Sequence, residues 1–430
     1  MKSFFIIFFL TLFSMLEAQT LLTVEDAVKI ALKNNYGILV ARNDAAISKN
    51  NNTIGNAGML PNVTIIGNGS YELNNVDQSY SNGSETSYTG LSSTSYNVGT
   101  ELSWTLFDGG KMFIIKNKLN EIEALGEIQF KDKVLQTQYD LISAYYEVVR
   151  LKQQLISIRE IINYNTELVK ILQISYNEGS LLKTNLLQAK IDLNVYLGNS
   201  INQEFVIDAA KKNLNLLMGT TIDNFFEVSD SIPINYSIDK NELNAKLNVT
   251  NTSILLLQKQ IDIARLSLNE FSRLRYPLLN FNAGYFLSHT DNSDGNILKS
   301  QTIGPQLGAS VSIPLFQSGN INRKISIAKL GVQSAEFVFE NTKLQIKKEL
   351  KNNIVNYENQ QRLLQIEVTN NEFTKEMLEI SMQRMKLGQT NTLEVHQAQE
   401  NYVQSCTRLI NIKFNMKIAE IKLKQLLAEL

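Results

Sequence analysis

The sequence contains one cysteine and two histidines among its 430 residues. Cys406 has no partner for an internal disulfide, and this set of residues cannot assemble a Cys/His metal site. The formal net charge of −1 offers no basic surface of the kind that binds nucleic acid. No cluster of nucleophile, acid and base stands out, so we expect neither an enzyme nor a cofactor-binding protein.

Proline is also scarce, with five residues in the whole chain. None of them lies in 108–218 or 319–430, so both stretches can form long helices without interruption. After residue 19, no apolar run approaches the roughly 18 residues that a membrane helix needs. Any membrane span in the mature chain must therefore be built in another way.

The one pronounced apolar run lies at the N-terminus. Lys2 precedes the mostly apolar residues 4–16, and Leu16-Glu17-Ala18 follows as a candidate cleavage site. We predict a signal peptide over 1–18, because the run is too short to span a bilayer comfortably. No cysteine follows the predicted cut, which argues against a lipid-anchored lipoprotein. The sequence therefore predicts an exported protein.

From about residue 23 the chain is a tandem duplication whose second copy follows the first by 209 residues. The equivalent pairs are Phe107 and Phe316, Gly179 and Gly388, and Ala189 and Ala398. A long-period repeat of this kind determines the architecture. We predict a first repeat at 19–218, an inter-repeat linker at 219–251 and a second repeat at 252–430.

Each repeat contains two stretches in which apolar and polar residues alternate. They are 63–73, 96–106, 279–288 and 302–313. The second face carries mostly small polar residues, although Ile66 interrupts it. Alternation predicts strands between an apolar and an aqueous medium, but a soluble two-sided sheet has the same pattern.

Three features favour a membrane barrel over a soluble sheet. The strands are about 10 to 13 residues long, aromatic residues lie near their ends, and the connections 74–93 and 290–300 are polar. Four strands cannot close a barrel, because the smallest membrane barrels have about eight. If these strands span a membrane, the barrel must be shared between chains, with eight strands from two chains or twelve from three.

Long helices follow Gly110 and Gly319, and at ~1.5 Å per residue each would be roughly 100 Å long. One stripe has the alternating four-and-three spacing of a coiled coil: Ile321, Ile325, Ala328, Val332, Ala335 and Phe339. Each long helix ends at a glycine, Gly179 or Gly388, before a second helix, which predicts two antiparallel hairpins. Further helices are expected at 24–53 and 254–274.

This order of elements resembles the TolC-like outer-membrane efflux proteins over nearly all of the mature chain. The motifs that carry the resemblance are the two hairpin tips and the strand-to-helix junction, with Phe107, Asp108, Gly109 and Gly110 in the first repeat and Phe316 and Gly319 in the second. The resemblance implies a mainly α-helical fold with a membrane β-barrel. In that fold a homotrimer shares a 12-stranded barrel, with four strands per chain, continuous with a coiled-coil tunnel in the periplasm.

The resemblance also implies a function in the cell outer membrane. The chain would be the channel of a tripartite efflux or type I secretion system, a passive exit duct surrounded by outer-membrane lipid. Its partners would be a periplasmic adaptor, or membrane fusion protein, and an inner-membrane transporter. The residues that would dock on the adaptor are Tyr176, Glu178, Gly179 and Ser180 at the first tip and Met385, Leu387, Gly388 and Gln389 at the second.

The tips would further form the periplasmic gate. Gates of this family place two carboxylates after the second tip, where this sequence has Glu394 and Gln397. Asn185 occupies the position equivalent to Glu394 in the first repeat. The resemblance therefore predicts one ring of three glutamates that favours cations at the constriction.

An exported trimeric coiled-coil fibre or adhesin without channel activity is the alternative. It would explain the long helices and the export signal. It leaves the four alternating strands and the hairpin glycines without a role, and ion conductance separates the two functions.

Overall fold

The computed structural model describes residues 21–295 and 297–430, without the side chain of Asn241. The predicted signal peptide at 1–18 lies outside the described residues. The chain divides into two units. We call residues 45–127 and 256–340 the strand unit, and residues up to 44, 128–255 and 341–430 the helical unit.

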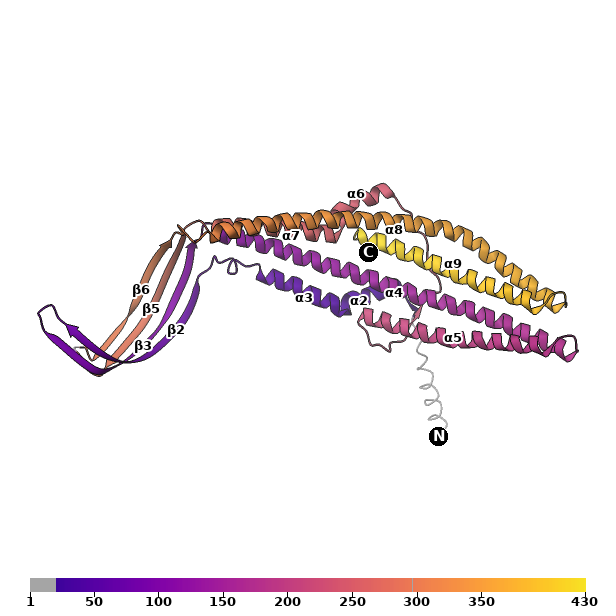
Figure 1. The fold of residues 1–430 in the computed structure, drawn as a ribbon, viewed down its shortest axis with the longest axis horizontal. Helices are drawn as coiled ribbons and strands as arrows, with labels where there is room; N and C mark the ends of the chain where they lie inside the picture. The colour runs from indigo at the N-terminus through magenta and orange to yellow at the C-terminus, as the bar shows by residue number, and fades with distance from the viewer. Residues whose placement is uncertain (1–20, 296) are drawn as a thin grey trace, which may run out of the picture. The chain divides into compact units, whose positions relative to one another are not determined.

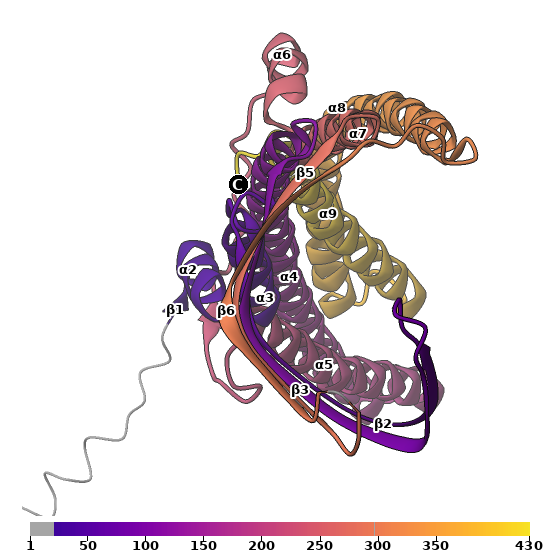
Figure 2. The same cartoon turned by 90° about the vertical axis from the view of Figure 1, so that its left-hand side faces the viewer.

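The strand unit contains one four-stranded antiparallel sheet in the order β2-β3-β5-β6. Its strands are β2 (Asn62–Ser79), β3 (Glu85–Phe107), β5 (Leu278–Asn292) and β6 (Lys299–Ser312). The strands lie side by side in a curved band (Figures 1 and 2). Each repeat supplies a hairpin of two strands, and β2 and β6 are the edges of the sheet.

The register divides the side chains of the sheet between two faces. Pairs such as Val63 with Leu102 and Leu287 with Ile303 fall on one face, which we call the apolar face. Pairs such as Asn68 with Asn97 and Asn282 with Gly308 fall on the other, the polar face. The predicted alternation is therefore kept across all four strands, because side chains of neighbouring residues point to opposite sides of a strand.

The strands are longer than the sequence pattern predicts. Residues 74–93 were expected to be a polar connection, yet β2 continues to Ser79 and β3 starts at Glu85. Backbone pairing across the hairpin satisfies the polar backbone groups whatever the side chains are, so a Ser/Asn-rich composition does not end a strand. Asn75 Oδ1 accepts the Gly90 N–H at 2.8 Å beside the irregularity between Asn74 and Val76.

Residues 24–53 were predicted to form one helix, but they form two, α2 (Val24–Asn34) and α3 (Tyr36–Asn51). Asn35 separates them: its backbone N–H donates to Ala31 O at 2.8 Å, and its Oδ1 accepts the Ile38 N–H at 3.1 Å. Its Nδ2 donates to Leu217 O at 2.8 Å. Asparagine side chains compete with helical hydrogen bonds in this way, and the long-range partner could not be read from local sequence.

The two predicted helical hairpins are present. The first joins α4 (Lys111–Asn177) to α5 (Lys183–Met218), and the second joins α8 (Asn320–Lys386) to α9 (Thr392–Leu426). In the helical unit the partners of each hairpin lie side by side (Figure 1). Among the described residues, every helix falls short of the combination of length and apolarity that crossing a membrane requires.

The stripe with coiled-coil spacing at the start of α8 is the covered side of that helix. Ile325 is only 8% exposed, and the other five members of the stripe are half-buried. Ile327, Leu330 and Phe337, which lie outside the stripe, are 61%, 62% and 74% exposed. The heptad spacing therefore identifies the side of α8 that packs within the chain.

The linker predicted at 219–251 contributes small elements. β4 (Glu227–Val228) pairs in parallel with β1 (Leu21–Leu22), and α6 (Lys240–Thr250) follows. The helix predicted at 254–274, beyond the linker, is α7 (Thr252–Arg273). Val228 joins a core cluster with Ala27, Leu141 and Leu214. This segment therefore packs on the helical unit and supplies part of its core.

Candidate functional site

The first hairpin tip is a short turn closed by backbone hydrogen bonds. α4 ends at Asn177, and Gly179 adopts a left-handed backbone with φ of 75°. The Gly179 N–H donates to Tyr176 O and the Ser180 N–H donates to Ser175 O, both at 3.0 Å. These bonds form a Schellman motif, the usual end of a helix at glycine. Leu182 precedes α5 without a side-chain cap.

The second tip repeats this geometry. Gly388 has φ of 67°, its N–H donates to Met385 O at 3.1 Å, and the Gln389 N–H donates to Arg384 O at 2.8 Å. A Cβ placed on Gly179 or Gly388 would meet no atom within 4 Å. Both glycines are therefore required by the backbone angle and not by crowding within the chain. Asn391 caps α9 by accepting the Glu394 N–H at 3.0 Å.

Glu394 does not present a free carboxylate. Arg384, near the end of α8, donates to Glu394 Oε1, and the Thr390 hydroxyl donates to Oε2. Arg384 also donates to Gln389 O at 3.2 Å, so it joins both sides of the turn. Arg384 is not among the site residues predicted from the sequence. Its position ten residues before Glu394 across a predicted hairpin turn is the signal that would have found it.

The other two predicted gate residues lie apart from this ion pair. Gln397 is exposed and donates to Asn401 Oδ1 at 3.3 Å. Asn185 lines a cavity of about 280 Å³ with residues of α4, α5 and α9, among them Asp192, Leu393 and His396. The structure thus brings Asn185 close to the start of α9, the helix that carries its counterpart Glu394.

The predicted docking residues divide into exposed and buried ones. Tyr176, Glu178, Ser180 and Gln389 are exposed, and Leu387 is 70% exposed. Met385 is only 7% exposed and belongs to the core cluster under the tips with Leu172, Leu378 and Val395. A buried methionine packs in the core under the turn and has no exposed surface that a partner could contact.

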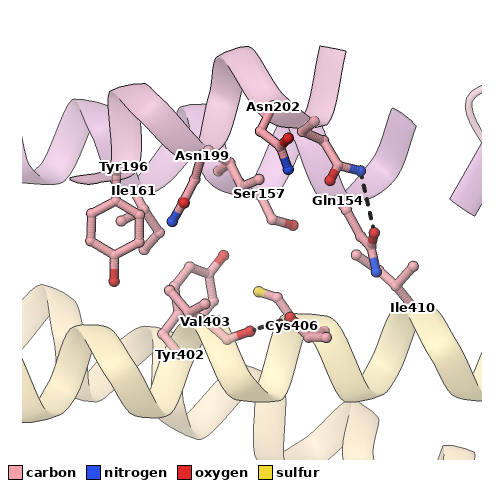
Figure 3. Close-up of a pocket in the computed structure, with 13 residues that line it drawn as sticks. Gln154, Ser157, Ile161, Tyr196, Asn199, Asn202, Tyr402, Val403, Cys406 and Ile410 are labelled. Carbon is pink, nitrogen blue, oxygen red and sulfur yellow. Dashed lines mark hydrogen bonds between the residues drawn. The ribbon is translucent and has the colours of Figure 1, made fainter. Parts of the chain in front are cut away.

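A second cavity, of about 300 Å³, lies further along the two hairpins (Figure 3). Amide and hydroxyl groups of α4 and α5, including Ser157 and Asn199, face Tyr402 and Cys406 of α9. Burial, followed by the neighbouring Cys406, raises the pKa of Tyr402, and its hydroxyl donates to Glu160 Oε2 at 2.9 Å. The cavity is therefore lined by neutral groups.

Glu367 is a buried carboxylate beside this region. Burial is the largest influence and favours the neutral acid. Hydrogen bonds from Arg408 Nε at 3.0 Å, the Ser405 hydroxyl at 2.9 Å and Asn370 Nδ2 at 3.4 Å outweigh it and hold the pKa of Glu367 below its ordinary value. The carboxylate therefore joins α8 to α9 in its charged form. Within the described residues, no group of three or more His, Cys, Asp and Glu could hold a metal ion.

The strand-to-helix junctions of both repeats use two successive left-handed residues. Phe107 is the last residue of β3, Gly109 and Gly110 have φ of 74° and 79°, and Asp108 Oδ2 accepts the Met112 N–H at 2.9 Å. In the second repeat, Ser318 and Gly319 have φ of 50° and 70°. Phe316 precedes them and is 86% exposed. The shared backbone turn explains the glycines at these positions.

The sequence that forms these repeats, the sheet and the hairpins matches a known protein family. The sequence matches the family described as outer membrane efflux protein over residues 27–220 and 244–429. The chain belongs to the outer membrane efflux protein family. This confirms the resemblance seen in the sequence. The efflux protein is a channel protein of the outer membrane with a periplasmic tunnel and not an enzyme, and the fibre alternative is set aside.

Solved channel structures share the fold of the efflux protein. The Campylobacter jejuni CmeC outer membrane channel matches with a TM-score of 0.79 at 15% identity, over 94% of this chain and 85% of CmeC. VceC of Vibrio cholerae matches with 0.76 at 17% identity, over 94% and 96%. The open state of Neisseria gonorrhoeae MtrE matches with 0.72 at 15% identity, over 94% and 88%. No curated protein sequence matches. The predicted TolC-like fold class is thereby confirmed.

Proposed function

We propose that three copies of this chain form the outer-membrane exit duct of a tripartite efflux or type I secretion system. The observation that carries the proposal is the open four-stranded sheet with one apolar face. Its edge strands β2 and β6 run in opposite directions, so β2 of one copy pairs antiparallel with β6 of the next. An unpaired edge in lipid would cost several kcal/mol per backbone group, and three copies close a barrel of twelve strands.

Exposed apolar stripes on the helical unit support self-assembly. On α5 they include Leu187, Ile191, Val195, Ile201 and Phe205, which are 47% to 71% exposed. On α8 they include Ile366, Phe373, Met377 and Ile380, which are 40% to 63% exposed. Apolar surface of this extent marks a protein interface. Contact between α5 of one copy and α8 of the next would cover both stripes and build the tunnel wall.

The tips supply the contact with the other components of the system. Repeats 19–218 and 252–430, joined by 219–251, each contribute one hairpin, so a trimer presents six tips. Leu182, Leu387 and Leu393 expose 72%, 70% and 72% of their surface there. These side chains would bind an apolar patch on a periplasmic adaptor, which in turn recruits an inner-membrane transporter.

Two measurements on the purified protein test this function. Mass determination in detergent should give three chains, and insertion into a planar bilayer should give ion conductance. A trimer that conducts no ions would overturn the channel, whereas a conducting dimer would overturn the twelve-stranded barrel and keep the channel.

We further propose that Glu394, Gln397 and Asn185 border the periplasmic constriction. Because Arg384 pairs with Glu394, these two side chains together add no net charge to the tip. The ring of three glutamates expected from the family is then neutralised by three arginines. Breaking the ion pair would unmask one charge or the other.

Selectivity measurements test this placement of the ion pair. Arg384→Gln should raise the preference for cations over anions in the reversal potential, Glu394→Gln should lower it, and the double variant should return to the wild-type value. Asp208→Asn, which breaks an exposed ion pair of α5 outside the proposed gate, is the control and should leave the selectivity unchanged. Unchanged selectivity in both single variants would remove the pair from the constriction, and conductance would still report on the channel itself.

A further inference from the structure

The polar face of the sheet has an unusual charge distribution. We consider the part of the sheet formed by β2 from Asn62 to Asn74 and by the residues of β3, β5 and β6 that lie in register with it. In that part, the register places two charged residues on the polar face. They are Glu72 and Glu101, and no lysine or arginine accompanies them in that part of the sheet. No hydrogen bond or ion pair joins the Glu101 carboxylate to another described side chain. The face is therefore locally acidic.

One aromatic ring interrupts this polar face. Phe286 of β5 pairs with Gly99 of β3 on one side and with Gly304 of β6 on the other. A Cβ on Gly99 would lie 2.3 Å from Phe286 Cδ1, and a Cβ on Gly284 would lie 2.4 Å from Phe286 Cε2. The ring thus lies over the backbone of both glycines, and because Phe286 is only half-buried, part of it stays accessible. The two glycines leave the space that the ring occupies.

The neighbouring residues complete an amphiphilic cluster. Ile66 pairs with Gly99, so Ile66, Gly99, Phe286 and Gly304 form one row across the four strands. Glu101 lies in the adjacent row, opposite Gly284, and is therefore diagonal to Phe286. Diagonal neighbours on one face lie about 7–8 Å apart, within reach of long side chains and of a small ligand between them. An apolar row thus borders an unpaired carboxylate.

We propose that Phe286, Ile66 and Glu101 form a binding site for organic cations with an apolar body. The proposal rests on the proposed function, because the polar face of a closed barrel lines the passage when the apolar face contacts lipid. The accessible part of the Phe286 ring attracts the cationic centre, Ile66 contacts the apolar part, and Glu101 supplies the opposite charge. In the trimer, three such sites, one in each copy, lie at one level of the barrel, and a ligand of this class passes them on its way through. An inorganic cation would interact with Glu101 alone, and the affinity of a neutral apolar molecule would not depend on the Glu101 charge.

Block of conductance by tetraphenylphosphonium tests the site, with tetraphenylborate as an anion of the same shape. The cation should block the wild-type trimer more strongly than the anion. Phe286→Leu, which keeps apolar bulk and removes the ring, should raise the half-blocking concentration of the cation by about tenfold. Glu101→Gln should have a similar effect, and Phe286→Tyr should restore the block. Glu72→Gln, the other carboxylate of this face, is the matched control and should leave the block unchanged.

The outcomes separate the site from the channel. Equal block by the cation and the anion, or an unchanged block in Phe286→Leu, would overturn the site while the conductance itself upholds the channel. Titration calorimetry of tetraphenylphosphonium with the detergent-solubilised protein gives a second readout that does not depend on conductance. Heat of binding that persists in the Phe286→Leu, Glu101→Gln double variant would equally overturn the proposal.

Discussion

Replacing Glu420 by alanine is expected to lower the stability of the helical unit by about 3–5 kcal/mol. Glu420 is only 5% exposed and accepts hydrogen bonds from Lys417 Nζ at 2.8 Å and Lys424 Nζ at 2.6 Å. The Lys417 side chain is itself only 10% exposed, so the variant leaves a buried ammonium without its counterion. Removing one partner of a buried ion pair is strongly destabilising because it leaves the other charge buried without compensation.

The position of this ion cluster makes the effect reach beyond α9. Lys424 Nζ lies 5.2 Å from the ring centre of Tyr236, whose carbonyl oxygen accepts the Tyr357 hydroxyl at 2.7 Å. Ile234 and Ile238 pack nearby against Met416 and Ala419. Loss of Glu420 should therefore loosen residues 232–238 of the linker together with α8 and α9.

Hydrogen exchange of α9 and of residues 232–238 measures the loss as a free energy of local opening. Asp208→Ala is the matched control, because Asp208 pairs with Lys212 on the surface at 2.8 Å and its removal should change stability by less than about 0.5 kcal/mol. Equal protection in the two variants would contradict the prediction.

The same variant has a spectroscopic signature. Burial, and then the charge of Glu420, raises the pKa of Tyr146 to about 12. Without Glu420 less negative charge opposes the phenolate, so the Tyr146 pKa should fall in an ultraviolet titration.

Replacing Gly109 by alanine is expected to cost about twice as much stability as the same change at Gly110. Both residues are left-handed, so each alanine carries a backbone penalty of roughly 1–2 kcal/mol. A Cβ on Gly109 would lie 2.5 Å from Tyr276 Cβ and 3.1 Å from Arg273 O, whereas a Cβ on Gly110 would meet nothing within 4 Å. Overpacking adds about 1–3 kcal/mol at Gly109 alone.

The pair of variants separates crowding from backbone strain. Hydrogen exchange at the end of β3 and the start of α4 should show faster opening in Gly109→Ala than in Gly110→Ala. Comparable exchange in both would mean that Tyr276 moves aside and that the backbone angle is the whole requirement. Ser318 stands at the position equivalent to Gly109, which shows that a side chain is tolerated in the second repeat.

Features that depend on neighbours in sequence could be predicted from the sequence. The alternation of apolar and polar residues predicted all four strands, and the glycines after α4 and α8 predicted both turns. Each of these depends on periodicity or on the backbone of a single residue. Strand ends at Ser79 and Glu85 and the break at Asn35 were missed, because pairing and a distant carbonyl override local composition there.

The duplication, the four alternating strands, the two hairpins and, through them, the family can all be recognised in the sequence. Which of their side chains meet is known only from the folded chain. A period of two gives the face of a strand but not its register, so only the paired sheet places Phe286 over Gly99 and beside Glu101. The sequence likewise places Arg384 and Glu394 on either side of a predicted turn, but only the structure shows that the two side chains meet, because that contact depends on how the chain reverses at Gly388.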